Sequence, residues 1–354
     1  MKRIISAATA LVLTLGLTSC ARVDPDKAQE SVQVIAMDTA MVISTYGRHS
    51  TRAAYASEDC IRALEDVLSR TREDSAVSCL NEAGTLELGE LGEELIPLLN
   101  AAERYRAETG GAFDITVAPV VSAWGFTAET FRVPGGAELE KLLDLVDGSA
   151  VRLEDRTVSL APGQSIDLGG IAKGYAADRL TDVFRENEVP RALATLGGNV
   201  LTWGDRPDGT PWRVGVKDPA RPDDQSAFVG ILELTNAFAV TSGGYQRYFE
   251  ENGKTYHHII DPATGYPADN GLTSVTVVAA ADTGEIPGNG TMCDAYSTAL
   301  FVMGEEEALD FWRERRADFD LVLVTADGRV VVTAGLAGAF APDEESGYAF
   351  ETVS

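Results

Sequence analysis

The residues best suited to metal chemistry stand in one helix-like segment. In CDAYSTALFVM (293–303), Asp294 and Thr298 are four positions apart, which brings both side-chain oxygens to one face of a helix, with Ser297 beside them. A carboxylate next to a hydroxyl suits a hard cation such as Mg²⁺, which prefers oxygen ligands and keeps waters or phosphates in its remaining positions. An Asp near a helix start is also a common cap, so this segment alone leaves both interpretations open.

A glycine-containing turn offers backbone donors to an anion. In SIDLGGIAKGYAAD (165–178), an apolar stretch that we expect to be a strand leads into Gly169 and Gly170 and then into a helix. Outward N–H groups and the positive end of the helix dipole suit a phosphate or pyrophosphate. The dinucleotide and P-loop patterns are both absent, and a tight strand–helix turn would need the same glycines. Lys173 favours the anionic ligand.

Two of the three histidines are adjacent, in TYHHIIDPATGYP (255–267). On a strand, His257 and His258 would point to opposite faces, so they are poorly placed to share one metal ion. The chain contains no H-E-x-x-H or C-x-x-C pattern, so a zinc site has little support. One histidine could accept a proton from a reacting group. The alternative for either is a core histidine that is bonded to the backbone.

Two further turns place polar groups beside apolar runs. VTSGGY (240–245) could bind phosphate through Thr241 and Ser242, or could only reverse the chain. TGGAFDITVAP (109–119) and the following Trp124-Gly-Phe126 supply aromatic side chains near Asp114, which the pattern predicts to be buried. Aromatic rings can stack on a planar heterocycle, although most rings in such runs belong to the core.

The elements that must position these groups show both helical and β periodicity. Apolar residues recur at helical spacing over 61–68, over 95–102 (a helix that we expect to end at Gly110-Gly111), and over 139–146. β-rich runs and turn-forming Pro and Gly clusters are interspersed with these helices. We expect strands at 32–46, 151–160, 212–217, 228–234, 272–280 and 320–334, and loops at 134–136, 205–211 and 284–290. With no internal repeat and no long linker, the sequence predicts one mixed α and β unit.

The first residues predict export. Lys2 and Arg3 precede an apolar run, 4–17, that is too short to span a bilayer comfortably and that ends in LTSC (17–20). The segment resembles a bacterial lipoprotein signal, in which residues 1–19 are removed and Cys20 is lipidated; a plain secretory signal is the alternative. Residues 20–31 then form a polar tether. We expect a lipid-anchored protein on the extracytoplasmic face of the cell membrane.

The charge balance excludes one class of partner. The 354 residues include 29 Lys and Arg against 55 Asp and Glu, a net charge of −26, and this field repels nucleic acid. Without residues 1–19, three cysteines accompany Cys20. They are Cys60, Cys79 and Cys293, and the sequence leaves their pairing open.

Eight segments, in this order, resemble the ApbE family of FAD:protein FMN transferases. Any one of them is common, but eight in order are specific, and together they span about 32–340. They are AMDT (36–39), DSAVSCLN (74–81), TGGAFDITVAPVVSAWGF (109–126), DLGGIAKGYAAD (167–178), LGGN (196–199), VTSGGYQRYF (240–249), HHIIDPATGYP (257–267) and DAYSTAL (294–300). The resemblance implies an α+β domain over 32–340, with a T-fold-like core and peripheral lobes, followed by an acidic tail, 341–354.

The resemblance also implies a reaction. An ApbE-like enzyme binds FAD, cleaves its pyrophosphate with Mg²⁺, transfers FMN to a Thr or Ser hydroxyl of an exported or membrane redox protein as a phosphoester, and releases AMP. Two alternatives keep the same segments. One is an Mg²⁺-dependent FAD pyrophosphatase that yields FMN and AMP, and the other is a flavin-binding lipoprotein without enzymatic activity.

Site residues carry over from the same resemblance. The implied metal ligands are Asp294, Ser297, Thr298 and the backbone carbonyl of Gly170, although many members have Asp at the position of Ser297. His258 matches the family's histidine and is the candidate general base for the acceptor hydroxyl, while Asp261 either positions it or shapes the turn at Pro262. The implied FAD site consists of Met37, Ala112, Phe113, Asp114, Asp167, Lys173 and Ile260, with Thr241 and Ser242 lining the same site.

Overall fold

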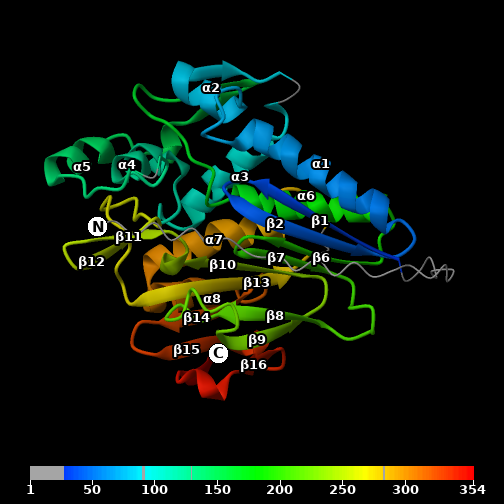
Figure 1. Cartoon of the computed structure of the whole chain (residues 1–354). Helices are drawn as coiled ribbons and strands as arrows, with labels where there is room; N and C mark the ends of the chain where they lie inside the picture. Colours follow the sequence, from blue (N-terminus) through cyan, green and yellow to red (C-terminus); the bar gives the residue numbers. More distant parts are fainter. Residues whose placement is uncertain (1–27, 90–91, 129, 282–283) are drawn as a thin grey trace.

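The computed structural model describes residues 28–89, 92–128, 130–281 and 284–354, and its centre is a nine-stranded sheet (Figure 1). The strand order is β1-β2-β6-β7-β10-β13-β14-β15-β17, and neighbours run antiparallel except for the final pair. The expected signal segment and Cys20 lie outside the described residues. The strands are β1 (Gln29–Ala36), β2 (Thr39–Tyr46), β6 (Arg191–Leu196), β7 (Asn199–Trp203), β10 (Ala237–Gly243), β13 (Leu272–Ala280), β14 (Asp320–Thr325), β15 (Arg329–Thr333) and β17 (Ala349–Val353).

Helices cover one face of this sheet, on the upper side of Figure 1. Strand residues alternate between the two faces: Val275 and Val277 of β13 pack in the helix-side core, while Val278 packs in a second core on the other side. Because both faces are covered around β13 and β14, these two strands are almost continuously buried, whereas β1 at the sheet edge alternates buried and exposed residues. The principal helices are α1 (Ser50–Leu68), α3 (Leu95–Glu108), α6 (Ala172–Glu186), α7 (Asn289–Met303) and α8 (Glu305–Arg315).

A second, three-stranded sheet packs against the opposite face. Its order is β16-β9-β8, and Val216, Val229 and Leu232 pack against Val278 and Val322 of the main sheet. This contact explains the apolar character of the predicted runs 212–217 and 228–234. The strands are β8 (Trp212–Lys217), β9 (Phe228–Leu234) and β16 (Phe340–Pro342).

Two smaller lobes extend from the core. One contains α2 (Ala76–Ala83) and a small sheet of β3 (Thr85–Glu87), β5 (Thr157–Ser159) and β4 (Arg152–Glu154), and the other contains α4 (Ala118–Trp124), α5 (Gly136–Leu143), β11 (Tyr248–Glu251) and β12 (Lys254–His257). Aromatic rings hold the second lobe together, and we refer to it as the aromatic lobe. Phe249 stacks on both Phe131 and Tyr256 at centroid distances of 5.3 and 5.4 Å. Short 3-10 turns complete the fold at Ile115–Val117, Gly148–Ala150, Gly244–Gln246, Ala334–Leu336 and Glu344–Ser346.

The prediction of one mixed α and β unit is confirmed, whereas several local predictions are wrong. The expected strands 151–160 and 320–334 are each two paired strands, β4 with β5 and β14 with β15, and the expected tether 20–31 ends earlier because β1 begins at Gln29. The run 32–46 is a hairpin rather than one strand, because Met37 and Asp38 adopt φ angles of 49° and 58° and reverse the chain between β1 and β2. Residues 165–168 form no strand, although the helix after Gly169-Gly170 is present. The segment after 340 is not a free tail, because Ala349–Val353 pairs with β15 as β17.

The described cysteines are unbridged: Cys60 and Cys79 are half-buried and Cys293 is buried. Burial raises the pKa of the Cys60 thiol to about 11, so this thiol is protonated at neutral pH. Among the described residues, no helix is both long enough and apolar enough to cross a bilayer.

Helices α6 and α7 approach each other closely at Gly174. A methyl group at this position would lie 2.2 Å from the Gly290 carbonyl oxygen and 2.6 Å from Cβ of Asp294. We expect Gly174→Ala to lower the free energy of unfolding by about 1–3 kcal/mol, the usual cost of overpacking, as measured by urea denaturation. Gly136→Ala on α5 is the control, since no heavy atom lies within 4 Å of its added methyl group. Equal stability of Gly174→Ala and the parent protein would contradict this account of the helix contact.

Candidate functional site

A cleft of about 2230 Å³ runs between the main sheet, the first turn of α6, α7 and the aromatic lobe. Its wall includes most of the residues that the sequence singled out. They are Met37, Ala112, Phe113, Asp114, Asp167, Gly170, Lys173, Thr241, Ser242, His258, Ile260, Asp294 and Thr298. Segments far apart in the sequence therefore meet at one site.

Oxygen donors converge where the start of α6 meets α7. Asp294 and Thr298 lie on one face of α7, as their spacing predicted, and Asp294 is only 3% exposed. Gly170 lies directly opposite: a Cβ atom there would come within 3.3 Å of Thr298 Oγ1. Glycine thus leaves open a small space bounded by backbone, a hydroxyl and a carboxylate. Donors of this type suit a hard divalent cation.

Asp294 is an acidic side chain that contributes to this space. Asp294 Oδ2 accepts a hydrogen bond of 2.8 Å from the Gly174 N–H, which fixes the carboxylate against α6. Within the described residues, no three His, Cys, Asp or Glu side chains group as a complete metal cage. A cation here would therefore take much of its coordination from hydroxyl, carbonyl, water or phosphate oxygens, an arrangement that Mg²⁺ commonly has.

Ser297 differs from its expected role. Its hydroxyl is fully buried, lies 3.0 Å from the Asp294 carbonyl oxygen to which it donates, and is 2.8 Å from Ser242 Oγ. Ser242 is in turn 3.3 Å from Thr298 Oγ1 and lines the cleft. The geometry therefore makes Ser297 a support for Ser242 and Thr298, because its own bonds to protein groups hold it behind the wall of the cleft.

A cation that the sequence did not single out supports the glycine turn. Arg70, at the end of α1, donates to Asp167 Oδ2 at 2.5 Å and to Ser122 Oγ at 2.6 Å. Asp167 Oδ1 accepts the Gly169 N–H at 2.9 Å, and Lys173 Nζ donates to the Gly169 carbonyl at 3.0 Å. Arg70 also lines the cleft and joins the glycine turn to the aromatic lobe. Its partner Asp167 is 97 positions away in sequence, so no local pattern indicates it.

Asp114 is mainly structural. Its Oδ1 accepts from the backbone and hydroxyl of Thr116 at 2.8 and 2.6 Å, and its Oδ2 accepts the Gly148 N–H at 2.9 Å. The carboxylate thereby shapes the wall that presents Ala112 and Phe113 to the cleft. Met37 lines the same cleft from the β1–β2 turn, held by a 2.7 Å bond from its N–H to Glu65 Oε1.

The two adjacent histidines have different environments. Nε2 of His257 lies 2.9 Å from the Ala268 carbonyl and its Nδ1 accepts the Ile259 N–H at 3.3 Å, so both ring nitrogens are bonded to backbone. His258 lines the cleft, with Nδ1 3.2 Å from the Arg247 carbonyl. Because a carbonyl can only accept, this contact needs the proton on Nδ1 and leaves Nε2 as the proton acceptor. His257 is thus the core histidine, and His258 is available for chemistry.

Burial, with nearby positive charges, keeps the His258 ring neutral. Burial, together with the positive charges of Arg247 and Lys173 and the neighbouring His257, lowers the pKa of His258 to about 3. Burial also lowers the pKa of His257. The wall of the cleft carries the basic side chains of Arg70, Lys173, Lys217 and Arg247. It also carries acidic side chains, namely Asp38, Glu65, Asp114, Asp167, Asp223, Glu250, Glu251 and Asp294, so a polyanionic ligand would need its charge neutralised locally.

Asp261 shapes a turn rather than contacting His258. Its Oδ1 accepts the Ala263 N–H at 2.8 Å and its Oδ2 accepts the Thr264 hydroxyl at 2.9 Å. Of the two roles that the sequence left open, the geometry supports the turn around Pro262. Ile260 belongs to the same turn. It is 5% exposed, pairs with Pro267 across the turn and lines the cleft.

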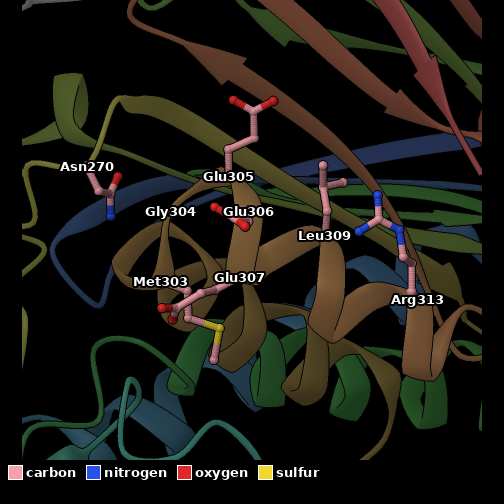
Figure 2. Close-up of a pocket in the computed structure, with 8 residues that line it drawn as sticks. All are labelled: Asn270, Met303, Gly304, Glu305, Glu306, Glu307, Leu309 and Arg313. Atoms are coloured by element: carbon pink, nitrogen blue, oxygen red, sulfur yellow. The ribbon is translucent and has the colours of Figure 1, made fainter.

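A smaller pocket of about 490 Å³ lies where α7 meets α8 (Figure 2). Its acidic side chains belong to the start of α8, and Glu305 is paired with Arg329 at 2.6 Å. Asn270 uses its amide N–H groups on the Phe301 and Val302 carbonyls, at 2.7 and 2.8 Å. Asn270 therefore caps the end of α7, while the Glu305–Arg329 pair joins α8 to β15. None of the residues that the sequence singled out lines this pocket, so we do not assign the site to it.

Known proteins resemble this chain over most of its length. The model of the ApbE family matches residues 37–323. The FAD:protein FMN transferase of Klebsiella pneumoniae is 34% identical over 321 residues, which cover 90% of this chain and 96% of that protein. The corresponding protein of Haemophilus influenzae is 30% identical, with 93% and 96% covered.

Solved structures show the same similarity. The ApbE protein from Thermotoga maritima superposes with a TM-score of 0.76 at 31% identity, covering 90% of this chain and 98% of its own. The flavin transferase ApbE from Vibrio cholerae gives a TM-score of 0.75 at 26% identity, covering 88% and 99%.

Proposed function

Since the chain belongs to the ApbE family and is an FAD:protein FMN transferase, we propose that it moves FMN from FAD to a Thr or Ser hydroxyl of an exported or membrane redox protein, in an Mg²⁺-dependent reaction that releases AMP. One observation carries the proposal: the cleft brings the Asp294 and Thr298 oxygens, the glycine turn and a neutral His258 into a single site. A pyrophosphate needs charge neutralisation on one side and an activated hydroxyl on the other.

The residues present fit Mg²⁺. Asp294, Thr298 and the backbone of Gly170 would hold it, with Ser242 and Ser297 fixing the Thr298 hydroxyl. When bound, the cation would neutralise pyrophosphate charge as the phosphorus–oxygen bond breaks. A single buried carboxylate leaves the remaining positions to water and phosphate oxygens, as is usual for Mg²⁺ in nucleotide sites.

The chain's own groups complete the reaction. Lys173 and Arg247 attract the phosphates, while the aromatic lobe offers flat apolar surface to the flavin or adenine rings. Nε2 of His258 takes the proton from the acceptor hydroxyl as that oxygen attacks the FMN phosphorus. The bond to the AMP oxygen breaks, AMP leaves with the electron pair, and a phosphoester links FMN to the acceptor.

The proposed reaction is tested by incubating an acceptor domain that carries a Thr with the protein, FAD and Mg²⁺, followed by intact-mass spectrometry. A mass gain of one phosphoester-linked FMN, lost when the metal is chelated, is the expected result. Free FMN and AMP without labelling of the acceptor would instead indicate FAD hydrolysis, and intact FAD would contradict catalysis on this acceptor.

Arg70 should affect substrate binding more than turnover, because it supports the glycine turn from outside the reacting groups. We expect Arg70→Met to raise KM for FAD about tenfold, equivalent to about 1.4 kcal/mol, with kcat within about threefold of the parent value. Steady-state AMP release measures both parameters. Arg62→Met is the control, since Arg62 forms an exposed pair with Glu58 on α1. A fall in kcat with unchanged KM would contradict a binding role.

The proposed membrane location depends on Cys20. We propose that lipidation of this residue anchors the protein on the extracytoplasmic face of the cell membrane, as LTSC (17–20) and the preceding apolar run suggest. Cys20→Ala should abolish incorporation of a labelled fatty acid and shift the protein from the membrane fraction to the soluble fraction. Cys79→Ala is the matched control and should change neither result. Retained labelling in Cys20→Ala would rule out this anchor.

A further inference from the structure

We propose that Asp178 is a positioning residue that sets the metal-binding geometry of α7 from the neighbouring helix α6. The proposal rests on the Mg²⁺ site proposed above. The carboxylate of Asp178 is buried, does not line the cleft, and has no role in the proposed reaction. Its side chain is 2% exposed and belongs to the same helix that begins at the glycine turn.

The carboxylate of Asp178 accepts four hydrogen bonds from the start of α7. Its Oδ1 accepts the Gly290 N–H at 2.8 Å, and its Oδ2 accepts the Gly288 and Thr291 N–H groups at 2.8 and 2.9 Å and the Thr291 hydroxyl at 2.5 Å. The first N–H groups of a helix have no partner within the helix, and a negative charge is favourable there. The N-cap residue of α7 is Gly288, which has no side chain to serve as a cap. The cap is therefore supplied by another helix.

This cap is one of several contacts between α6 and α7 that fix how far α7 can slide along α6. Asp178 contacts Gly290, and one turn earlier on α6 the Gly174 N–H bonds to Asp294. Gly174 and Gly290 also touch directly, because a Cβ on Gly290 would lie 2.8 Å from the Gly174 carbonyl and 2.6 Å from Asp178 Oδ1. Gly174 and Asp178 on α6 are four residues apart, as are their partners Asp294 and Gly290 on α7, so the two contacts set one register.

The register matters because the proposed site is divided between the two helices. Gly170 precedes α6, whereas Asp294 and Thr298 belong to α7. A shift of α7 by one residue would move its side chains by about 1.5 Å along the axis and about 100° around it. Such a shift would remove Asp294 and Thr298 from Gly170. Residues behind metal ligands commonly change metal affinity 10- to 100-fold when they are mutated.

The test compares two buried carboxylates in equivalent roles. Asp218 is 1% exposed and accepts from the Ala220 N–H, Arg221 Nε and the Tyr348 hydroxyl at 2.9, 2.7 and 2.9 Å, but it does not line the cleft. Asp178→Asn and Asp218→Asn should both lower the melting temperature. Only Asp178→Asn should weaken metal binding, by about tenfold or more, as measured by Mn²⁺ titration with EPR and by the Mg²⁺ concentration that gives half-maximal AMP release.

The possible results distinguish failure of the positioning role of Asp178 from failure of the proposed Mg²⁺ function. Metal affinity of Asp178→Asn within twofold of the parent value, or an equal loss in Asp218→Asn, would overturn the positioning role. If Asp178→Asn does not fold, Thr291→Val, which removes one donor to Asp178, is judged by the same criterion. Absence of metal binding and of metal-dependent AMP release in the parent protein would instead overturn the proposed Mg²⁺ function.

Discussion

Replacing Asp294 with asparagine is expected to reduce FMN transfer and AMP release by at least about 10³-fold. Asparagine keeps the shape of the side chain and an oxygen that can accept the Gly174 N–H, now bonded to Oδ2 at 2.8 Å, but it removes the carboxylate that we assign to the proposed metal site. Loss of a preorganised electrostatic contact in a closed site commonly costs 10²–10³ in rate, and here the cation itself would be lost. FAD should still bind through the other walls of the cleft.

Two measurements separate the chemistry from binding and folding. Flavin fluorescence should give a Kd for FAD within about tenfold of the parent value, and AMP release at saturating FAD should be near background. Asp310→Asn is the control on the neighbouring helix α8, where Asp310 forms an exposed pair with Arg313. Metal-dependent turnover at the parent rate in Asp294→Asn would show that the metal site has been assigned to the wrong residues.

His258→Ala should lower kcat by about 10²–10⁴-fold, the usual contribution of a general base, with a small effect on the Kd of FAD. His257→Gln is the matched control, because His257 bonds only to backbone groups around Ala268 and Ile259. That variant should lose stability and keep most of its turnover. If His258→Ala weakened FAD binding strongly and turned over normally at saturation, His258 would hold substrate instead of moving a proton.

The pH dependence follows from the lowered pKa of His258. In the free enzyme this pKa is about 3, so the imidazole is neutral throughout the physiological range and kcat/KM should show no loss near pH 6.5. The phosphates of bound FAD favour the charged ring and raise its pKa. The acid limb of kcat should therefore lie at a higher pH than that of kcat/KM. Coincident limbs in the two profiles would argue against His258 as the base.

The lowered pKa values of His258 and His257 also predict that the folded protein loses stability at low pH. Unfolded histidine titrates near pH 6.5, whereas His258 and His257 have lowered pKa values in the folded protein. Below pH 6.5 the unfolded chain therefore binds protons that the folded chain does not. The stability associated with these rings is complete above pH 6.5 and is lost as the pH falls towards 3.

Local periodicity predicted much of the fold. The spacing of Asp294 and Thr298 placed both oxygens on one helix face, and apolar runs located β8, β9 and β13. The β1–β2 turn was missed because its left-handed residues are Met37 and Asp38 rather than the usual Gly or Asn. The apolar stretch 165–168 was misinterpreted as a strand because an extended buried segment has the same composition.

Contacts between residues far apart in the sequence could not be predicted from any local sequence pattern. The bond from Arg70 to Asp167 joins residues 97 positions apart, and Asp178 contacts Thr291 113 positions away. A lone Arg or Asp in the sequence gives no indication of such a partner. The family resemblance implied that Ser297 is a metal ligand, but its hydroxyl is bonded to Ser242 behind the cleft wall. Adjacency in sequence does not specify which hydroxyl faces a ligand.

The position of β17 has a consequence for the synthesis and quality control of this protein. Until Ala349–Val353 has been translated, the sheet ends at β15, whose Val330–Val332 backbone would offer an apolar, unpaired edge to any other chain. β17 replaces that edge with one that carries Glu351 and is mostly exposed. A chain that terminates a few codons early would therefore keep its catalytic cleft and become prone to aggregation. Loss of the last residues should be observed as loss of soluble protein before any change in the chemistry.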